Sequence, residues 1–400
     1  RSSSLARILV VEFDRDLDPG LVARKIAQMP GVEYAEPQWE RYPLHIPNDE
    51  LIPQQWYLDR INAFGGWDIE RGDTSIVVGI VDTGIDPTHP DLLGTLWQNQ
   101  GEMGFDDRGI DRRSNGIDDD GNGIIDDWQG YDFGGDDGIT PDNDPSPHYY
   151  HGTHVAGIVG ASGNNSIGIA GVAFGVRLMS VKVSDEDANE PVIINGYDGL
   201  LYAARMGCRV INCSWGGRGY SAAEQEVLDS VRRLGALVIA SAGNNGDATE
   251  IFPGSYIGVL SVAALNSDDS RSDFSNYGLR VGIAAPGRGV ISTVPARNGV
   301  PAYRIENGTS VSAPIVSGVA ALVALQRPEY RPDQIAARLR ATAEAFPTDL
   351  ESDAPYLGSG RIDARRALAD DTILKWAEIE RWSVASEAGN RVIEPGDAAT

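Results

Sequence analysis

Apolar and polar residues alternate in blocks along the chain from about residue 48 to residue 368. Short apolar runs predict six strands, at residues 76–82, 176–183, 209–215, 237–243, 259–265 and 281–285. Stretches with helical spacing predict helices near residues 152–161, 193–206, 222–234, 312–326 and 333–343. Apolar strands that alternate with helices predict an α/β fold, with a mostly parallel, twisted sheet between layers of helices.

The first 47 residues carry a separate pattern. Residues 7–13 and 32–39 alternate like strands, and residues 19–29 have helical spacing. This predicts a small α+β unit over residues 1–47, with an irregular arm as the alternative. We expect one large domain at residues 48–370. Residues 371–400 lose the alternation and are interpreted as a linker, a frayed tail or the start of a C-terminal β module.

Composition limits the classes of partner. An apolar content of 42% in 400 residues is enough for one large core. A formal net charge of -25 disfavours nucleic acid and anionic membranes, and no apolar run approaches the roughly 18 residues of a membrane span. No charged-then-apolar leader follows Arg1, so we expect an export signal to be absent or already removed. Cys208 and Cys213 are expected to be free, buried thiols.

The candidate chemistry is centred on Ser310. The turn-prone Asn307-Gly308 pair precedes an apolar helical run, which places Ser310 at the mouth of a helix. A serine needs a neighbouring base before it becomes a good nucleophile, and the base needs an acid to orient it. The candidates are His151, which opens a predicted helix, and Asp82, which ends a predicted strand.

Other polar residues follow predicted strands in the same way. Ser214 and Asn244 lie at the ends of two further strands. Parallel sheets bind their ligands beyond the carboxyl ends of the strands. We therefore expect Asp82, Ser214 and Asn244 to converge with the helix starts at His151 and Ser310.

The chain resembles the subtilisin-like serine proteases. The resemblance spans residues 30–368, and the order Asp, His, Ser along the chain is that of this family. It rests on three motifs: Asp82-Thr83-Gly84, His151-Gly152-Thr153-His154-Val155-Ala156-Gly157 and Asn307-Gly308-Thr309-Ser310-Val311-Ser312-Ala313-Pro314. It implies a three-layer fold, and an endopeptidase with Ser310 as nucleophile, His151 as general base and Asp82 as its orienting acid. It also implies an oxyanion hole formed by the Asn244 amide and the Ser310 NH group.

The resemblance implies a substrate-binding region as well. Its members lie in two segments that follow neighbouring predicted strands: Ser214, Trp215, Gly216 and Gly217, then Ser241, Ala242 and Gly243. The family commonly has a leucine where Trp215 stands, and we hypothesise that the larger ring narrows the neighbouring subsites. The acidic segment 184–191 suggests a preference for basic substrates, with a solvated loop as the alternative.

Rival functions remain open at this point. A second Asp-Thr/Ser-Gly copy, which an aspartic protease would need, is absent from the sequence. His151 and His154 lack the i, i+4 spacing of a helical zinc motif, and we expect structural roles for His154 and His89. An inactive relative that serves as a calcium-dependent binding or adhesion module is the main alternative, and a non-proteolytic hydrolase is another.

The N-terminal unit resembles part of a propeptide. Residues 30–37 resemble the end of the propeptides that template folding in this family and lay their tail in the active site. The resemblance implies that the chain's own propeptide is a partner, that cleavage falls within residues 42–48, and that the protein is secreted. Peptide or protein substrates are the other expected partners, and we expect a monomer.

An acidic insertion separates the Asp and His motifs. Residues 102–144 contain 14 acidic residues and three arginines, and such a density repels itself unless a cation binds. Residues 118–127 match the first half of a calcium loop, with a solvated acidic loop as the alternative. Gln129 occupies position 12, where an EF-hand has Glu. The candidate ligands are Asp118, Asp120, Asn122 and Ile124, with Asp126 or Asp127 as the closing carboxylate.

A second calcium site is implied by the resemblance alone. Residues 164–171 resemble the tight calcium loop that follows the His helix in this family. In that pattern Asn165 contributes its side chain, and Asp49 and Asp91 add carboxylates. The remaining ligands are the carbonyl groups of Gly163, Ile167 and Ile169.

Overall fold

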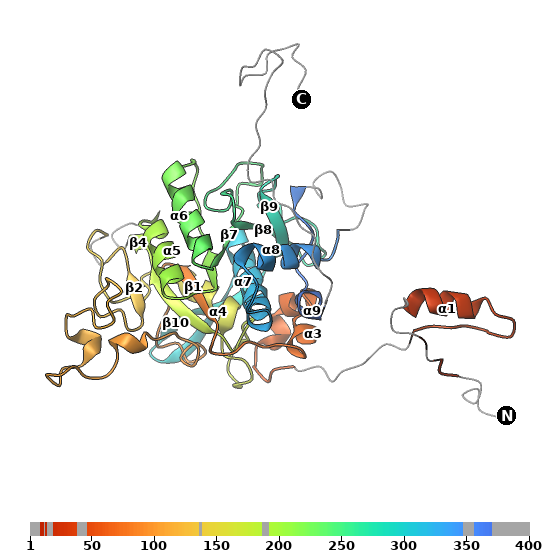
Figure 1. The fold of residues 1–400 in the computed structure, drawn as a ribbon, viewed down its shortest axis with the longest axis horizontal. Coiled ribbons are helices and arrows are strands. Elements are labelled where there is room, and N and C mark those ends of the chain that lie inside the picture. Colours follow the sequence, from red (N-terminus) through yellow and green to blue (C-terminus); the bar gives the residue numbers. More distant parts are fainter. Residues whose placement is uncertain are drawn as a thin grey trace, which may run out of the picture. The chain divides into compact units, whose positions relative to one another are not determined.

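The computed structural model describes residues 9–11, 13, 19–37, 46–135, 138–185, 192–346 and 356–369. The chain divides into two compact units, residues 1–43 and 44–400, whose elements are labelled in Figure 1. In the first unit, helix α1 (Pro19–Ala27) confirms the predicted helix. The two predicted strands are wrong in their described parts, residues 9–11, 13 and 32–37, which belong to no strand. A strand needs a ladder partner, and the side chains of Leu9 and Val10 are exposed instead.

The second unit is built on a seven-stranded sheet in the order β2-β3-β1-β6-β7-β8-β9. Neighbouring strands in this sheet run parallel. The strands are β1 (Val77–Asp82), β2 (Gly130–Asp132), β3 (Arg177–Lys182), β6 (Val210–Cys213), β7 (Leu237–Ser241), β8 (Leu260–Leu265) and β9 (Val281–Pro286). All six predicted strands are confirmed, and β2, inside the acidic insertion, is the one strand of this sheet that the sequence did not predict.

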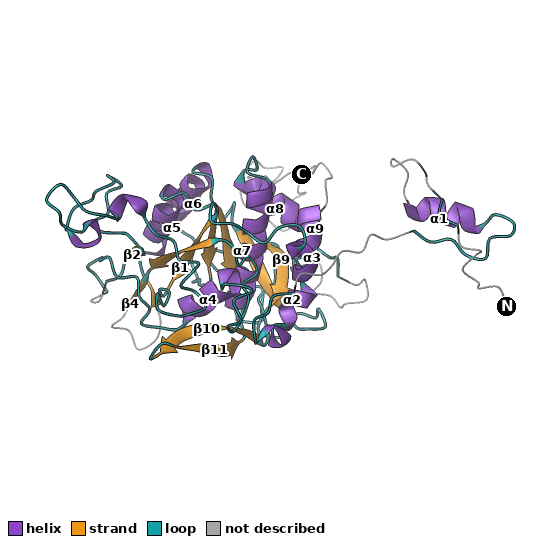
Figure 2. Ribbon diagram, turned by 90° about the horizontal axis from the view of Figure 1, so that it is seen from below, coloured by secondary structure: helices purple, strands orange, loops and turns teal. Residues whose placement is uncertain are grey.

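Helices cover both faces of the sheet (Figure 2). Helices α4 (His151–Gly160) and α7 (Thr309–Gln326) pack on one face, and α5 (Gly196–Arg205) and α6 (Ala222–Arg233) pack on the other. The side chains of β1 point to both faces of the sheet. Val78 and Ile80 belong to the core cluster under α4 and α7, and Val81 belongs to the core cluster under α5 and α6. The predicted three-layer α/β fold is confirmed.

The remaining helices are shorter or lie nearer the ends of the unit. They are α2 (Trp56–Arg60), α3 (Ala63–Trp67), α8 (Pro332–Ala341) and α9 (Ala364–Ala369), with 3-10 turns at Ile52–Gln54, Gln100–Glu102 and Arg112–Ser114. The five predicted helices correspond to α4, α5, α6, α7 and α8. Cys208 and Cys213 are free and buried, as expected, and both belong to the core cluster under α5 and α6.

Helix α7 is the central helix of the unit. Among the described residues it is the one helix whose length and composition would suit a membrane span, but 83% of the relevant window is buried inside the protein. It packs against α4 and against strands β6, β7, β8 and β9. Its apolar character therefore belongs to the core.

Two antiparallel hairpins complete the unit. Strands β10 (Val290–Arg297) and β11 (Val300–Glu306) pair through an Asn298-Gly299 turn in which both residues have positive φ. A smaller hairpin joins β4 (Ser184–Asp185) and β5 (Val192–Ile193). The larger hairpin packs against α4, where the Ser292 and Thr293 hydroxyls donate to carbonyls of the helix. It thereby supports the helix that carries His151.

Candidate active site

Asp82 and His151 are joined by a direct contact. Strand β1 ends at Asp82, helix α4 begins at His151, and Oδ1 of the aspartate lies 2.7 Å from Nδ1 of the histidine. Asp82 is 1% exposed, and its Oδ1 also accepts the NH group of Thr83. A carboxylate can only accept, so Nδ1 carries the hydrogen and Nε2 keeps a lone pair. The aspartate thus fixes the tautomer that a general base requires.

The surroundings raise the pKa of His151. Burial acts to lower the pKa, but the charge of Asp82, its hydrogen bond and the charge of Glu306 together outweigh burial. The side chain remains 29% exposed. The imidazolium form is therefore stabilised in a side chain that solvent still reaches.

Ser310 lies in the first turn of α7, directly after the Gly308 cap. Pro314 stands one helical turn later and has no NH group to donate to the Ser310 carbonyl. The Ser214 hydroxyl donates to that carbonyl instead, at 2.7 Å. Ser214, which follows β6, thus ties the end of the sheet to the turn that carries the candidate nucleophile.

A buried polar chain extends this connection. The Asn212 side chain donates from Nδ2 to the Ser214 hydroxyl at 2.9 Å. The Ser317 hydroxyl, one turn beyond Pro314, donates to Asn212 Oδ1 at 2.9 Å. Strand β6 and helix α7 are therefore held together at the level of Ser310 by side chains whose polar atoms are satisfied.

The side chain of Asn244 is fixed by the same helix. Its Oδ1 accepts both the NH group and the hydroxyl of Thr309, each at 2.9 Å. With the oxygen held there, Nδ2 remains as a donor on an exposed residue. A Cβ atom on Gly308 would lie 2.8 Å from Ser310 Oγ and 3.5 Å from Asn244 Nδ2. The hydroxyl and the amide donor therefore lie on the same side of Gly308.

Asn276 supports the loop that carries Asn244, and the sequence did not single it out. It is 1% exposed, and its backbone NH donates to Gly243 O. Its Oδ1 accepts the Asn245 NH group at 2.7 Å, and its Nδ2 donates to Thr249 O at 3.0 Å. Gly243 has a φ of 107°, and a Cβ there would lie 2.6 Å from the Asn276 amide. The loop conformation thus requires this glycine and is held by this asparagine.

Glu306 is a second residue that the sequence did not single out. Its Oε1 accepts the Tyr150 hydroxyl at 3.1 Å and forms an ion pair with Arg304, which stacks on the Tyr150 ring. Tyr150 precedes His151 directly, and Glu306 lies four residues before Ser310. The chain segments that lead into the two candidate catalytic residues are therefore in contact.

The predicted substrate-binding segments lie side by side. The Ser241 hydroxyl donates to Trp215 O, and Gly217 pairs with Phe252 through two backbone hydrogen bonds. The Trp215 indole NH donates to Val81 O at 2.7 Å, and its ring packs against Gly196 and edge-on to Tyr197. Gly216 and Gly217 are exposed, but the NH and C=O groups of Gly217 are both engaged by Phe252, which leaves Gly216 as the exposed glycine for backbone pairing. Of segment 184–191, residues 186–191 lie outside the described residues.

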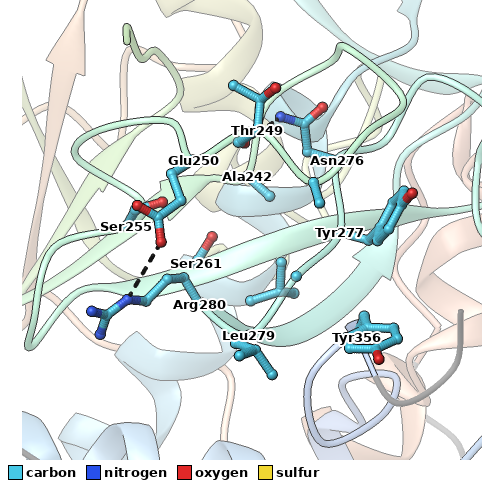
Figure 3. Close-up of a pocket in the computed structure, with 13 residues that line it drawn as sticks. Ala242, Thr249, Glu250, Ser255, Ser261, Asn276, Tyr277, Leu279, Arg280 and Tyr356 are labelled. Carbon is cyan, nitrogen blue, oxygen red and sulfur yellow. Dashed lines mark hydrogen bonds and ion pairs between the residues drawn. The ribbon is translucent and has the colours of Figure 1, made fainter. Parts of the chain in front are cut away.

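A cavity of about 340 Å³ lies beside Ala242 (Figure 3). Tyr277 and Tyr356 line one side of it, and Glu250 forms an ion pair with Arg280 at 3.8 Å on the other. Its lining residues include neither the candidate triad nor Asn244. The cavity therefore adjoins one predicted substrate-binding residue and lies away from the candidate chemistry.

His89 and His154 have the structural surroundings that the sequence predicts. Each Nε2 atom lies about 3 Å from a backbone oxygen of β11, that of Ala302 for His89 and that of Arg304 for His154. Burial lowers the pKa of His154 to about 4. Both rings are buried and connect the larger hairpin, β10-β11, to the domain.

At the predicted tight calcium loop, Asn165 contacts both candidate carboxylates, those of Asp49 and Asp91. Asp49 accepts the NH groups of Asn164 and Asn165, and Asp91 accepts those of the Asn165 amide and the Ile169 backbone. Asp49 is 3% exposed and Asp91 is fully buried. Burial raises the pKa of Asp91 to about 6, and the charge of Asp49 adds to that shift. Two buried carboxylates that repel each other and contact the same asparagine fit a hard cation.

The candidate ligands of the acidic insertion fall into two groups. Asp118 accepts the NH groups of Gly121, Asn122 and Gly123, and Asp126 accepts that of Gly116. Asp120 and Asp127 instead lie in a group with Glu102, with one oxygen of each within 4.8 Å of the others. The sequence did not identify Glu102 as a member. Asn122 donates to both aspartates of that group, and its Oδ1 accepts the Ile124 NH group.

The fold and the site define a class of protein: a three-layer α/β structure with an aspartate and histidine pair and a serine at a helix start. Comparison with known proteins agrees. The model of the subtilase family matches residues 73–366. The thermophilic serine proteinase of Bacillus sp. (strain AK1) is 32% identical over 353 residues, which are 87% of this chain and 75% of that protein.

Two further comparisons point the same way. The extracellular basic protease of Dichelobacter nodosus is 34% identical over 383 residues, 90% of this chain, and the chain spans 62% of that protein's length. A solved protease structure from Pseudoalteromonas arctica PAMC 21717 matches with a TM-score of 0.67 and 29% identity, over 81% of this chain and 99% of that one. The chain belongs to the subtilase family and is a subtilisin-like serine endopeptidase.

Proposed function

We propose that Asp82, His151 and Ser310 form the catalytic triad of this enzyme. His151 Nε2 takes the Ser310 proton as Oγ attacks the peptide carbonyl, and the resulting imidazolium is stabilised by Asp82. His151 then gives the proton to the leaving amine, which departs as the acyl-enzyme forms. A water molecule, deprotonated by His151, hydrolyses the acyl-enzyme and regenerates Ser310.

The oxyanion of each tetrahedral intermediate is stabilised by Asn244 Nδ2 and by the Ser310 NH group. The support for this role is the fixed orientation of Asn244, whose oxygen is bound by Thr309 while its amide donor remains exposed. The start of α7 adds the positive end of the helix dipole, which favours negative charge at the same position.

The contact between Asp82 and His151 is the main support for the proposed triad. The experiment compares cleavage of a peptide library by the parent protein and by Ser310→Ala. We expect the substitution to lower kcat by about 10⁶-fold, since triad members act as a unit. Cleavage by Ser310→Ala at the parental rate would refute the assignment of the nucleophile.

An inactive calcium-dependent binding module is the alternative. The contact of Asp82 with His151, and that of Asn244 with Thr309 next to Ser310, disfavour it. A folded parent protein that binds calcium but cleaves neither peptides nor activated esters would support that alternative. Comparison of peptide and ester turnover also separates a peptidase from a hydrolase of other substrates.

We further propose that the enzyme is secreted, acts as a monomer and carries part of its own propeptide at residues 1–47. The support is the name of the extracellular relative together with the resemblance of residues 30–37 to propeptide ends. Residues 42–45 of the proposed cleavage segment, and the whole of segment 371–400, lie outside the described residues. Asp49 is a proposed calcium ligand, so a mature N-terminus beyond Asp49 would contradict this placement.

Calcium binding at the loop of residues 163–169 is proposed as the stabilising element of the domain. Asp49, Asp91 and Asn165 would hold the ion with the carbonyl groups of Gly163, Ile167 and Ile169. The ion would supply the positive charge that the two buried carboxylates lack. Segments at residues 48–51, 89–92 and 163–169 would then be fixed to one another.

The substrate-binding region is proposed to consist of Ser214 to Gly217 and Ser241 to Gly243. An extended peptide can approach the exposed Gly216 backbone because glycine has no side chain to obstruct it, whereas Gly217 is already paired with Phe252. Trp215 is held by Val81 and Tyr197, so its ring forms a fixed wall. Profiling Trp215→Leu on a peptide library tests this role, and unchanged preferences would refute it.

A further inference from the structure

The acidic insertion contains a group of three carboxylates with one unsatisfied, buried oxygen. Glu102 and Asp127 are fully buried and Asp120 is exposed. Glu102 Oε1 accepts the NH groups of Asp119 and Asp120, at 2.7 and 3.2 Å. Glu102 Oε2 is buried without a hydrogen-bond partner among the described residues. A buried carboxylate oxygen without a partner is costly and indicates a missing ligand.

Neighbouring amides and a phenol hold the other two carboxylates. The Asn99 amide donates to Asp120 and Asp127, at 2.8 and 2.7 Å, and the Tyr202 hydroxyl donates to Asp127 at 2.7 Å. Within the described residues, no arginine or lysine forms an ion pair with Glu102, Asp120 or Asp127. The group thus has neutral donors and no positive charge of its own.

We propose that Glu102, Asp120 and Asp127 bind a calcium ion, with Glu102 as the ligand that closes the site from outside the loop. The metal ligands would all be carboxylate oxygens, which suit Ca²⁺, whereas structural zinc sites favour sulfur and nitrogen ligands. The ion satisfies the free oxygen of Glu102 and cancels the repulsion among the three carboxylates. Glu102 thereby takes the place of the acidic residue that position 12 of the loop lacks.

The electrostatics of the two buried members agree with this assignment. Burial raises the pKa of Glu102, and the charges of Asp127 and Asp120 raise it further. The hydrogen bonds from the NH groups of Asp119 and Asp120 lower it but do not cancel the rise. Burial likewise raises the pKa of Asp127. A bound cation would reverse both shifts by favouring the charged carboxylates.

The site would connect the insertion to the catalytic domain. Asn99 follows a segment that pairs with β3, since Trp97 donates its NH group to Leu178 O. Tyr202 lies on α5, which covers one face of the central sheet. The ion would therefore hold the 118–127 loop against the segment that pairs with β3 and against α5. Asp118 and Asp126 instead accept NH groups from residues 116–123 of the insertion itself.

The test counts bound calcium ions in the full chain with Ser310→Ala, which prevents self-digestion. Isothermal titration with CaCl₂ is compared for this parent, for Glu102→Gln, and for Asp118→Asn as the matched control. Gln at position 102 can still accept the NH groups of Asp119 and Asp120. We expect Glu102→Gln to lose one ion per chain or to weaken one site at least tenfold, and Asp118→Asn to stay within threefold of the parent.

Other results overturn the proposal. One such result is that Glu102→Gln binds calcium with the stoichiometry and affinity of the parent. Another is that Glu102→Gln and Asp118→Asn lose calcium binding equally, which would place the ion in the loop around Asp118. A larger response to MgCl₂ than to CaCl₂ would reassign the ion. Circular dichroism checks folding, and Asp120→Asn, at an exposed position, replaces Glu102→Gln if that variant does not fold. The inference refines the proposed calcium dependence, and its readout is independent of peptidase activity.

Discussion

Nδ1 of His151 lies 2.7 Å from Oδ1 of Asp82, although 69 positions separate the two residues along the chain. The contact forms because β1 ends at Asp82 and α4 begins at His151, while Thr83 accepts the NH group of Gly152 and fixes the two ends together. The backbone of a strand end and a helix start therefore determines the orientation of the imidazole. The proposed general base is prepared before any substrate arrives.

Glu306 should influence the acidic side of the pH profile. The base must be neutral, so kcat/KM falls as the pH drops through the pKa of His151. The charge of Glu306 raises that pKa, so Glu306→Gln should lower it and keep the enzyme active at lower pH. The measurement is kcat/KM against pH at low ionic strength.

Glu226→Gln is the matched control, because Glu226 is an exposed acid on α6. Its profile should coincide with that of the parent. If Glu306→Gln leaves the acidic limb in place, or moves it to higher pH, the electrostatic coupling between Glu306 and His151 is wrong.

Asn244→Asp separates the two functions of the asparagine side chain. The aspartate keeps an oxygen for the NH group and hydroxyl of Thr309 but removes the amide donor. We expect kcat to fall by about 10²- to 10³-fold, the usual loss for one oxyanion donor, for which subtilisin is the standard example. The melting temperature should change little, and a variant with parental kcat would remove Asn244 from the oxyanion hole.

Asn276→Ala tests the support of the Asn244 loop. The substitution leaves the Asn245 NH group and Thr249 O without their side-chain partners, so the loop should lose its fixed position. We expect kcat to fall by about tenfold or more, because small displacements of catalytic groups are costly. The pKa of His151 read from the pH profile should not move.

Asn266→Ala serves as the control for that variant. Asn266 holds the neighbouring 266–272 loop through Ser270 and Ser272 and has no hydrogen bond to residues 243–249. It should lower stability without the loss of kcat. Equal losses of kcat in both variants would mean that Asn276 acts through general stability alone.

Removal of calcium should destabilise the domain, and Asp91→Asn tests whether Asp91 binds the ion at the tight loop. In Ser310→Ala, chelation should lower the melting temperature by about 4 °C for each ion lost, since an ion at 100 times its Kd contributes about 2.7 kcal/mol and a domain of about 320 residues shifts by about 1.5 °C per kcal/mol. Asp91→Asn should melt below Ser310→Ala when calcium is present. With chelator the difference between the two proteins should be smaller, because the lost repulsion from Asp49 offsets the loss of one acceptor for the Asn165 amide or the Ile169 NH group.

Calorimetry of both proteins with and without calcium provides this comparison. The exposed Asp73→Asn change should leave the calcium dependence intact. An Asp91→Asn variant with the full parental response to calcium would exclude Asp91 as a ligand.

Much of the fold follows from local patterns in the sequence. Successive side chains of the buried strands point into one core cluster and then the other. The strands are therefore apolar runs that can be recognised from the sequence alone. Strand β2 escaped prediction because it is three residues long and lies in an acidic, glycine-rich insertion. The β10-β11 hairpin did carry a signal, the Asn298-Gly299 turn between alternating residues, which the strand assignment overlooked.

The site divides in the same way. Asp82, His151, Ser310 and Asn244 could be proposed from the sequence because each ends or follows a predicted strand or opens a predicted helix, which is a local property. Glu102, Asn276 and Glu306 were not found, because their importance depends on partners that only the folded chain brings to them. The N-terminal strands failed for a related reason, since alternation alone does not supply a neighbouring strand.

The most direct test of the central claim is the site of covalent labelling by a fluorophosphonate. Nucleophilic attack by an activated serine displaces fluoride and leaves a phosphonyl group on its oxygen, so peptide mass spectrometry can locate the modified residue. We expect one adduct, on Ser310, which is lost in Ser310→Ala and strongly slowed in His151→Ala. A folded parent protein that is not labelled, or one that is labelled at another serine, would contradict it.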